Sequence, residues 1–375
     1  MSYLNRVKDA LADIRREHRY RELPVRQLSD VIDFSSNDYL GMAKEPQVVE
    51  ALKHATRAGS GGARLLAGRN REHSLLEEEL AAWLGRERAL LFSSGYLAGV
   101  GTIPVLAELS ETILSDRANH ASLIDGVRLS PKPRAIYQHA TLPRFVEGEP
   151  ALVVSETLFG MDGDTIDAAA LLQTLRNDDV MLLDEAHALG IAGPEGAGFG
   201  RELQDPRVVI LGTLSKALGT LGGFVAGPAA TIDLLVNRAR TFIFDTALPP
   251  ALVLAARVSL HLTRTADDRR ARLHANAAQL RAALPFDSAQ GRLAQDDTRQ
   301  AQDDTSPIVP VVLGSEERAV RVSEELLARR IFVPAIRPPT VPPGTSRLRV
   351  TLRADHTPDQ IDLLAAELQR CIATS

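Results

Sequence analysis

Short apolar runs alternate with helical stretches through the middle of the chain, and this alternation constrains the fold more than any other feature. The helical stretches include residues 96–107 and 167–176. Such alternation predicts an α/β fold, with a mostly parallel central sheet and helices on both faces. In sheets of this kind ligands bind at the carboxyl ends of the strands. The predicted strands are residues 88–92, 112–115, 135–138, 150–155, 180–184, 207–212 and 222–226.

The segments on either side of this region have different patterns. Residues 2–20 show the pattern of a charged amphipathic helix, and residues 251–283 form one long helical stretch. A polar duplication follows, in which Ala294-Gln-Asp-Asp-Thr298 recurs as Ala301-Gln-Asp-Asp-Thr305, and we interpret it as a solvated loop. The rest predicts a small α+β domain, with strands at 308–312, 330–333 and 347–352 and helices at 315–329 and 357–371. We therefore predict an N-terminal helix and arm (1–45), a large α/β domain (46–255) and a small C-terminal α+β domain (256–375).

The charge balance and the cysteine count argue against several classes of protein. The formal net charge is -5 and aromatic residues make up only 4% of the chain, so nucleic-acid binding is not expected. The single cysteine, Cys371, excludes an intrachain disulfide and a thiolate metal cluster. No apolar run reaches the ~18 residues of a membrane span, and no signal-peptide core follows Met1. We expect a cytoplasmic protein with no membrane partner and no metal.

A lysine beside a glycine-rich turn indicates the chemistry. Lys216 follows an apolar run and precedes the turn Gly219-Thr-Leu-Gly-Gly223, and an upstream apolar run ends in Asp184-Glu-Ala-His187. Pyridoxal phosphate requires an amine that binds it covalently and a carboxylate that keeps its ring nitrogen protonated. A histidine such as His187 can bond its phenolic oxygen. We therefore predict a pyridoxal phosphate site, although a lone lysine in a loop is more often a surface residue.

The four residues from Asp184 to His187 also match the DEAH box of nucleic-acid helicases. That class needs a Walker A loop, Gly-x-x-x-x-Gly-Lys-Ser/Thr. The glycine-rich segment from Gly59 to Gly68 has no following Lys-Ser/Thr pair. The sequence therefore argues against an ATPase.

Two further loops can complete the cofactor site. The segment after the strand at 88–92 has small residues at a helix start, where backbone N–H groups bind phosphate well. His120 follows another strand and can stack on a pyridine ring and move a proton. The residues expected at the cofactor phosphate are Ser94, Gly95, Tyr96 and Thr213.

Two arginines share the predicted strand 347–352. We expect one of Arg347 and Arg349 to bind a carboxylate bidentately and the other to face solvent or a neighbouring acid.

Together these segments resemble the α-oxoamine synthases, which are pyridoxal-phosphate enzymes of fold type I. The resemblance runs over nearly the whole chain, and its motifs are specific jointly rather than singly. The run from Ala335 to Leu352 is similar to that of the biotin-pathway branch of the family. The motifs are Ser36-Asn-Asp-Tyr-Leu-Gly41, Gly59-Ser-Gly-Gly-Ala-Arg-Leu-Leu-Ala-Gly68, His73, Asp116-Arg-Ala-Asn-His-Ala-Ser122, Met161-Asp-Gly-Asp164, Asp184-Glu-Ala-His187 and Thr213-Leu-Ser-Lys216.

The resemblance implies a decarboxylative condensation of L-alanine with a pimeloyl thioester, carried on coenzyme A or on acyl carrier protein. Lys216 would carry the cofactor and remove the alanine Cα proton, and His120 would stack on the ring and help to activate the acyl carbonyl. The resemblance also implies a homodimer with its sites at the interface. The other residues that it places at the site are Asp184, His187 and Glu156 at the cofactor, Thr246 at the phosphate bound by the partner subunit, Asn37 and Arg349 at the substrate carboxylate, and Arg21 at the acyl-donor entrance.

The chain departs from the family pattern at two positions. Gly160 stands where members often have serine, which removes a hydroxyl that could contact the substrate carboxylate. Glu185 occupies a position that is often aspartate or a small residue. Two alternatives stay open: a family member that uses glycine or serine, and a non-catalytic partner subunit. The presence of Lys216, Asp184 and His120 together argues against the second.

Overall fold

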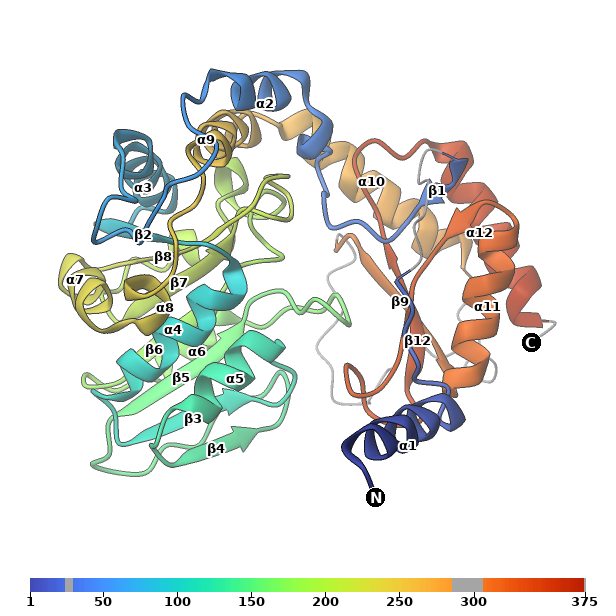
Figure 1. Ribbon diagram of the computed structural model, residues 1–375, viewed down its shortest axis with the longest axis horizontal. Coiled ribbons are helices and arrows are strands. Elements are labelled where there is room, and N and C mark those ends of the chain that lie inside the picture. Colours follow the sequence, from blue (N-terminus) through green and yellow to red (C-terminus); the bar gives the residue numbers. More distant parts are fainter. Residues whose placement is uncertain (24–29, 285–305, 374–375) are drawn as a thin grey trace. The chain divides into compact units, whose positions relative to one another are not determined.

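The computed structural model describes residues 1–23, 30–284 and 306–373. The chain divides into two compact units (Figure 1). The larger unit comprises Asn37–Gly160 and Asp164–Arg272, and the smaller one Met1–Ser36, Met161–Gly163 and Leu273–Ser375. The predicted polar loop at 294–305 lies outside the described residues. Within those ranges, no helix is both long enough and apolar enough to cross a membrane.

A seven-stranded sheet forms the centre of the larger unit (Figure 1). Its order is β2-β8-β7-β6-β5-β3-β4, with β8 antiparallel to both of its neighbours and the remaining neighbours parallel. This arrangement confirms the predicted α/β fold. The strands are β2 (Arg88–Phe92), β3 (Thr112–Asp116), β4 (Arg134–Tyr137), β5 (Ala151–Glu156), β6 (Val180–Asp184), β7 (Val208–Thr213) and β8 (Gly223–Gly227).

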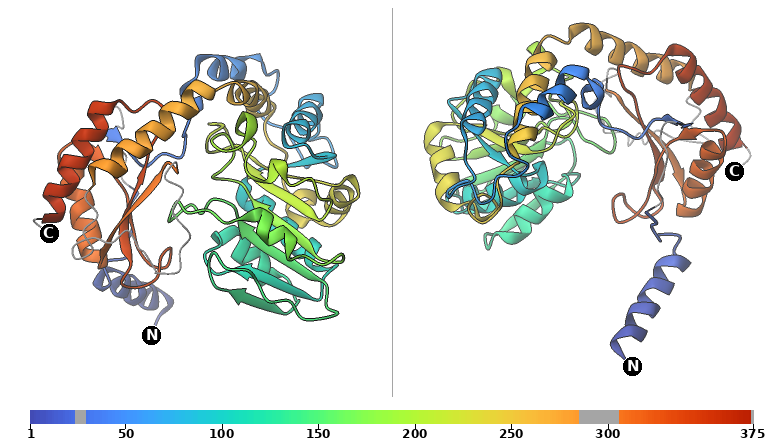
Figure 2. Two further views of the ribbon diagram at one scale, coloured as in Figure 1. Left: turned by 180° about the vertical axis from the view of Figure 1, so that it is seen from behind. Right: turned by 45° about the horizontal axis from the view of Figure 1, so that its top comes forward.

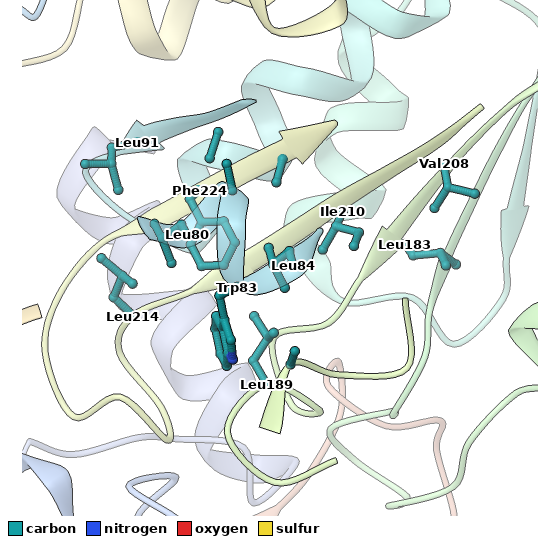
Figure 3. Close-up of a cluster of buried hydrophobic side chains, with 14 of the residues drawn as sticks. Leu80, Trp83, Leu84, Leu91, Leu183, Leu189, Val208, Ile210, Leu214 and Phe224 are labelled. Atoms are coloured by element: carbon teal, nitrogen blue, oxygen red, sulfur yellow. The ribbon is translucent and has the colours of Figure 1, made fainter. Parts of the chain in front are cut away.

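Helices cover both faces of this sheet because successive strand side chains point to opposite sides. Met181 and Leu183 belong to a core cluster with α3, α6 and α9, whereas Leu182 belongs to a second cluster with α4, α5, α7 and α8. Figure 3 shows the first cluster, in which Phe224 lies beside Leu80 and Leu84. The helices are α2 (Pro46–Ala51), α3 (Arg71–Leu84), α4 (Gly95–Ala107), α5 (Ala121–Leu129), α6 (Ala168–Gln173), α7 (Ala229–Arg238), α8 (Arg240–Ile243) and α9 (Pro250–Arg264), with short 3-10 turns at Met42–Lys44, Leu52–His54, Pro194–Gly196 and Gly200–Glu202.

The smaller unit is built on a three-stranded antiparallel sheet in the order β11-β12-β9, with α11 packed against it and α12 packed against α11 (Figure 1). A separate parallel pair joins β1 to β10. Helix α1 has no buried residue, and the right view of Figure 2 shows it standing clear of the sheet. The elements are α1 (Tyr3–Arg16), β1 (Ile32–Asp33), β9 (Ile308–Gly314), α11 (Glu316–Ala328), β10 (Ile331–Phe332), β11 (Ala335–Ile336), β12 (Ser346–Thr351) and α12 (Pro358–Ala373).

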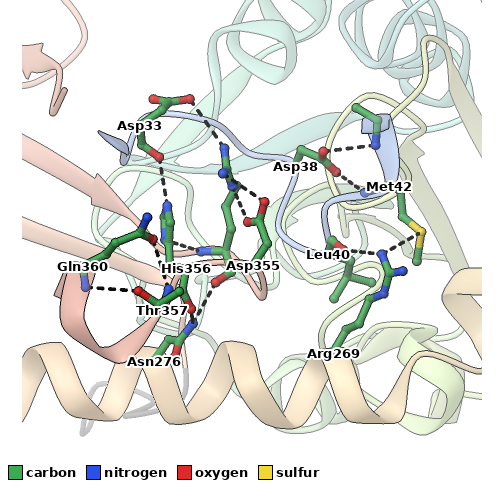
Figure 4. Close-up of polar contacts among 12 residues, drawn as sticks. Asp33, Asp38, Leu40, Met42, Arg269, Asn276, Asp355, His356, Thr357 and Gln360 are labelled. Atoms are coloured by element: carbon green, nitrogen blue, oxygen red, sulfur yellow. Dashed lines mark hydrogen bonds and ion pairs between the residues drawn. The ribbon is translucent and has the colours of Figure 1, made fainter. Parts of the chain in front are cut away.

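Hydrogen bonds tie the N-terminal segment to the C-terminal part of the chain. The Thr351 N–H donates to the Phe34 carbonyl at 2.8 Å. His356 Nε2 donates to the Asp33 carbonyl at 3.0 Å, and its Nδ1 accepts from the Arg353 N–H at 3.1 Å (Figure 4). Burial lowers the pKa of His356 to about 4, which matches a neutral ring with one donor and one acceptor nitrogen.

The compact units group the chain differently from the three predicted segments, 1–45, 46–255 and 256–375. Residues 1–36 join the C-terminal part, because β1 pairs with β10. The single helix predicted at 251–283 is two helices, since α9 ends at Arg264 and α10 (Asp267–Ala283) begins with two aspartates that favour a new N-terminus. The unit boundary after Arg272 lies within α10 rather than at residue 256.

Candidate active site

Two buried carboxylates lie side by side at the carboxyl ends of neighbouring strands. Asp184 ends β6 and Glu156 ends β5, and the two are register partners. Each is 4% exposed. Burial raises the pKa of Asp184, an effect that the Lys216 cation opposes, and burial together with the Asp184 charge raises the pKa of Glu156 to about 8. A cation bound here would therefore be stabilised by Asp184.

Lys216 is half-buried in a loop that closes on itself directly after β7. The Leu214 N–H donates to the Gly222 carbonyl at 2.9 Å, and the Gly219 N–H donates to the Lys216 carbonyl at 2.8 Å. Gly219 has φ 61°, and a Cβ there would lie 2.2 Å from the Ala43 nitrogen, so the turn requires glycine. The loop holds the lysine where its charge acts on Asp184 and Glu156.

His187 is buried at 6% exposure and lies against the backbone of Gly160. A Cβ at Gly160 would be 2.2 Å from His187 Nε2. On the other side of the ring, Nδ1 is 2.7 Å from the Tyr39 hydroxyl, which donates to Asn37 Oδ1 at 3.3 Å. The glycine that departs from the family pattern is therefore the wall against which this imidazole packs.

His120 caps α5 and is the exposed member of the group. Its Nδ1 accepts from the Ser122 N–H at 3.2 Å, so in the neutral ring the proton is on Nε2. Desolvation of the ring lowers the pKa of His120, against the opposing effect of Asp184. The His120 N–H donates to Glu156 Oε1 at 2.6 Å, so Glu156 fixes the loop that carries His120.

The N-terminus of α4 forms a close-packed cradle. Ser94 caps the helix and its Oγ accepts from the Leu97 N–H at 3.1 Å. A Cβ at Gly95 would lie 3.1 Å from Thr213 Cβ, and one at Gly223 would lie 2.4 Å from the Gly95 nitrogen. The N–H groups of a helix start that have no partner within the helix attract anions, and at α4 the Ser94 cap takes up the Leu97 N–H.

These features fit pyridoxal phosphate. The buried Asp184 carboxylate suits a ring N–H cation, the helix start suits a phosphate, and the Lys216 amine suits a covalent link. Tyr96 meets the His120 ring edge-on, with centroids 6.4 Å apart, at the mouth of the same cradle. Glu185 is fully buried beside the site and accepts from the Gly200 N–H at 2.6 Å, and burial raises its pKa to about 7.

The two arginines of β12 and Arg21 belong to the smaller unit. Arg347 and Arg349 are each 4% exposed, so neither faces solvent, and of the two surroundings expected for the second arginine Arg347 meets the neighbouring acid, Asp162. Residues two apart on a strand share one face of the sheet. Arg349 Nη1 donates to Thr351 Oγ1 at 2.8 Å, and Arg347 pairs with Asp162.

The substrate or partner contacts expected of four residues stay predictions. Arg21 Nη2 donates to the Pro338 carbonyl at 3.3 Å within the smaller unit. Thr246 is exposed on the larger unit, where it forms a bridge with Ala63. Asn37 Oδ1 accepts from the Tyr39 hydroxyl. The binding of a substrate carboxylate by Asn37 and Arg349 stays a prediction.

Sequence reasoning missed two residues that the fold brings to this region. Tyr39 lies within the Ser36–Gly41 motif, two residues after the predicted site residue Asn37. Its position and its hydroxyl could therefore have identified it from the sequence. His139 follows β4 outside every motif, and only the folded chain shows that it bonds to two carboxylates.

Comparisons with known proteins cover most of the chain. The family model of aminotransferase class I and II matches residues 29–368. An 8-amino-7-oxononanoate synthase of Cellvibrio japonicus is 41% identical over 94% of this chain and 92% of its own, and one of Thioalkalivibrio sulfidiphilus is 43% identical over 92% and 89%. A serine palmitoyltransferase of S. paucimobilis, solved with bound PLP, has a TM-score of 0.87 at 27% identity over the whole of both chains. The 8-amino-7-oxononanoate synthase of Francisella tularensis has a TM-score of 0.76 at 26% identity, over 92% of this chain and 99% of that one.

Proposed function

The chain belongs to the aminotransferase class I and II family and, within it, to the 8-amino-7-oxononanoate synthases, and from this we propose that it condenses L-alanine with a pimeloyl thioester. The products are 8-amino-7-oxononanoate, carbon dioxide and the free thiol. The protein is a pyridoxal-phosphate enzyme and an acyltransferase of biotin biosynthesis. The observation that carries the proposal is the Lys216 loop next to the buried Asp184 carboxylate, whose pKa this cation lowers against the effect of burial.

The residues of the larger unit divide the chemical work. Bound pyridoxal phosphate supplies a ring that withdraws electrons and so stabilises negative charge at the alanine Cα. Asp184 would keep the proton on the ring nitrogen, and the N-terminus of α4 with Thr213 would hold the phosphate. The Lys216 amine removes the Cα proton of alanine.

His120 has the right tautomer for its proposed part. Its Nδ1 is occupied by the Ser122 N–H, so Nε2 carries the proton that it would donate to the acyl carbonyl oxygen. A lowered pKa keeps the ring neutral near pH 7, and a neutral ring can stack on a cofactor beside the Lys216 cation without adding a second positive charge. We assign the substrate carboxylate to Arg349 and Asn37, and the acyl-donor entrance to Arg21.

A homodimer completes the proposal. Thr246 is exposed beside Phe244, whose side chain is 70% exposed, and a large exposed apolar residue next to a site motif favours an interface. Thr246 would bond the phosphate held by the partner subunit. The acyl group can arrive on coenzyme A or on acyl carrier protein, and a cytoplasmic location stays a prediction.

The test starts from the purified protein with pyridoxal phosphate. L-alanine, glycine and L-serine are added separately, and the absorbance of the bound cofactor is recorded before pimeloyl-CoA is supplied. We expect alanine to change the spectrum most, and thiol release with a product of the mass of 8-amino-7-oxononanoate to follow. A response mainly to glycine or serine would keep the family and change the product, and a chain that binds no cofactor would indicate a non-catalytic partner subunit.

Lys216→Ala provides the decisive variant. It should abolish turnover while the circular dichroism of the folded protein stays the same, because Lys216 is only half-buried in the loop after β7 and belongs to neither core cluster of the sheet. Lys53→Ala, at an exposed lysine of the same unit, is the matched control and should keep full activity. Near-normal activity of Lys216→Ala would contradict the mechanism.

A further inference from the structure

His139, which follows β4, lies between two buried carboxylates. Its Nδ1 is 3.0 Å from Asp116 Oδ1 and its Nε2 is 2.7 Å from Asp164 Oδ2. Asp116 is 1% exposed and Asp164 4%. The ring of Phe159 meets the imidazole edge-on, with centroids 4.3 Å apart, and excludes water from that side. The three polar side chains therefore form one largely buried group, in which the His139 side chain is 15% exposed.

The geometry determines the charge of the imidazole. An ionised carboxylate only accepts hydrogen bonds, and a neutral imidazole has a proton on one nitrogen and a lone pair on the other. With both nitrogens of His139 at carboxylate oxygens, only the doubly protonated ring can donate to Asp116 and Asp164 together. Burial alone lowers the pKa of His139, but the two hydrogen bonds outweigh it and raise the pKa to about 10.

Asp116 connects the group to His120 through the chain. Asp116 is the last residue of β3, and the loop from it to His120 carries the proposed ring-stacking residue. Its carboxylate also accepts from the Ala118 N–H at 2.8 Å and from the Ala140 N–H at 3.2 Å. The position of this loop thus depends on the same carboxylate that binds His139.

Asp164 connects the group to His187 through the turn that contains Gly160. The Asp164 carbonyl accepts from the Phe159 N–H at 2.9 Å, which closes the turn that contains Gly160. The backbone of Gly160 is the wall against the His187 ring. A shift of Asp164 would therefore move the surface on which His187 packs.

We propose that His139 is a protonated positioning residue that joins the loop carrying His120 to the turn carrying Gly160, through its ion pairs with Asp116 and Asp164. The inference rests on the proposed function for its role in the reaction, and on geometry alone for its charge. His139 does not touch the reacting atoms. It holds two walls of the site in their relative places.

The charge is tested first, by ¹⁵N NMR of the histidine rings in the holoenzyme at pH 6, 8 and 9.5. The signal of His139 is assigned by its loss in His139→Gln. We expect both ring nitrogens to be protonated at pH 8, where an ordinary histidine is neutral. A neutral His139 ring at pH 8 would overturn the proposal.

The positioning role is tested on His139→Gln, with His261→Gln, at an exposed histidine of α9, as the matched control. His139→Gln should lower kcat by about 10- to 100-fold, because misplaced catalytic groups cost that much, and should change the dichroism of the bound cofactor. If His139→Gln folds poorly with two unpaired carboxylates, the double variant His139→Gln/Asp164→Asn removes one of those charges and takes its place. We expect this double variant to recover the melting temperature but not kcat.

The outcomes separate the two proposals. A lower melting temperature with unchanged kcat and unchanged dichroism would make His139 a structural residue only and overturn the inference. Failure of the wild-type enzyme to condense alanine with pimeloyl-CoA would overturn the proposed function, while the NMR and dichroism results would still decide the inference about His139.

Discussion

At the scale of single residues, the most informative position is one that has no side chain. Gly160 departs from the family pattern, and a missing hydroxyl was the consequence expected from the sequence. The structure shows a steric consequence instead, because a Cβ there would be 2.2 Å from His187 Nε2. The absence of a side chain at this position therefore determines where His187, a residue that we propose for the cofactor site, can lie.

Gly160→Ser should push the His187 ring off its contact with Tyr39. Contacts under 3.0 Å force movement of the ring or of the backbone, so we expect weaker pyridoxal phosphate binding and a kcat lower by about tenfold or more. Titration of the apoenzyme with the cofactor and steady-state kinetics would measure this. Gly59→Ser is the control, since a Cβ at Gly59 has no atom within 4 Å. Equal cofactor affinity in the two variants would contradict the packing argument.

Asp184→Asn removes the charge that would hold the ring proton of the cofactor. An amide keeps the shape but cannot stabilise a buried cation, so kcat should fall by about 10²- to 10³-fold, which is the cost of losing one preorganised charge interaction. Asp178→Asn, at an exposed aspartate in the turn two residues before β6 begins, should leave kcat unchanged. The comparison needs only purified variants at equal cofactor occupancy.

At the scale of secondary structure, sequence patterns located the strands of the large sheet to within about one residue, because a buried strand is a local apolar run. They did not show that β8 runs against both of its neighbours. They also merged α9 and α10 into one helix. Strand direction and helix breaks depend on what each element packs against, and that information is not local.

The contact of β8 with the start of α4 yields a prediction about elements. A Cβ at Gly223 would be 2.4 Å from the Gly95 nitrogen and from the Ser94 carbonyl oxygen, so Gly223→Ala should separate the strand from the phosphate cradle. We expect lower cofactor affinity and a lower melting temperature. Gly227→Ala, on the same strand, meets its nearest atom at 3.6 Å and should behave like the wild type. If Gly227→Ala lost as much cofactor affinity as Gly223→Ala, the effect would come from the strand and not from the cradle.

At the scale of the whole molecule, histidines held in different protonation states should limit stability on both sides of neutral pH. His73 and His356 are held neutral, since burial lowers the pKa of each to about 4. Unfolding lets them bind protons below pH ~6.5, so stability present at neutral pH is lost as pH falls from there towards 4. The pH dependence that His139 gives to the free energy of unfolding is opposite, because its folded pKa of about 10 lies above its unfolded value. Its contribution to stability is complete below pH ~6.5 and is lost as pH rises towards 10.

Urea unfolding of the wild type and two variants at pH 4.5, 6.5 and 9.5 would test this. His356→Gln should flatten the acid side of the stability profile and leave the alkaline side unchanged. His139→Gln should flatten the alkaline side instead, with about equal losses of stability relative to the wild type at pH 4.5 and 6.5 and a much smaller loss at pH 9.5. If the free energy of unfolding differed between the wild type and each variant by the same amount at all three pH values, neither histidine ring would titrate as its surroundings require.

The amino-acid sequence by itself determined the fold class, the strand positions and the family resemblance, and it indicated the lysine and the aspartate that we propose for the cofactor. These depend on local periodicity and on short motifs, which can be read along the chain. Only the tertiary structure decided that Glu156 pairs in register with Asp184, that Gly160 packs on His187, that residues 1–36 join the C-terminal unit and that His139 bonds to two carboxylates. Each of these joins residues far apart in the sequence. Such contacts exist only once the strands have paired and the chain has folded around its buried polar groups.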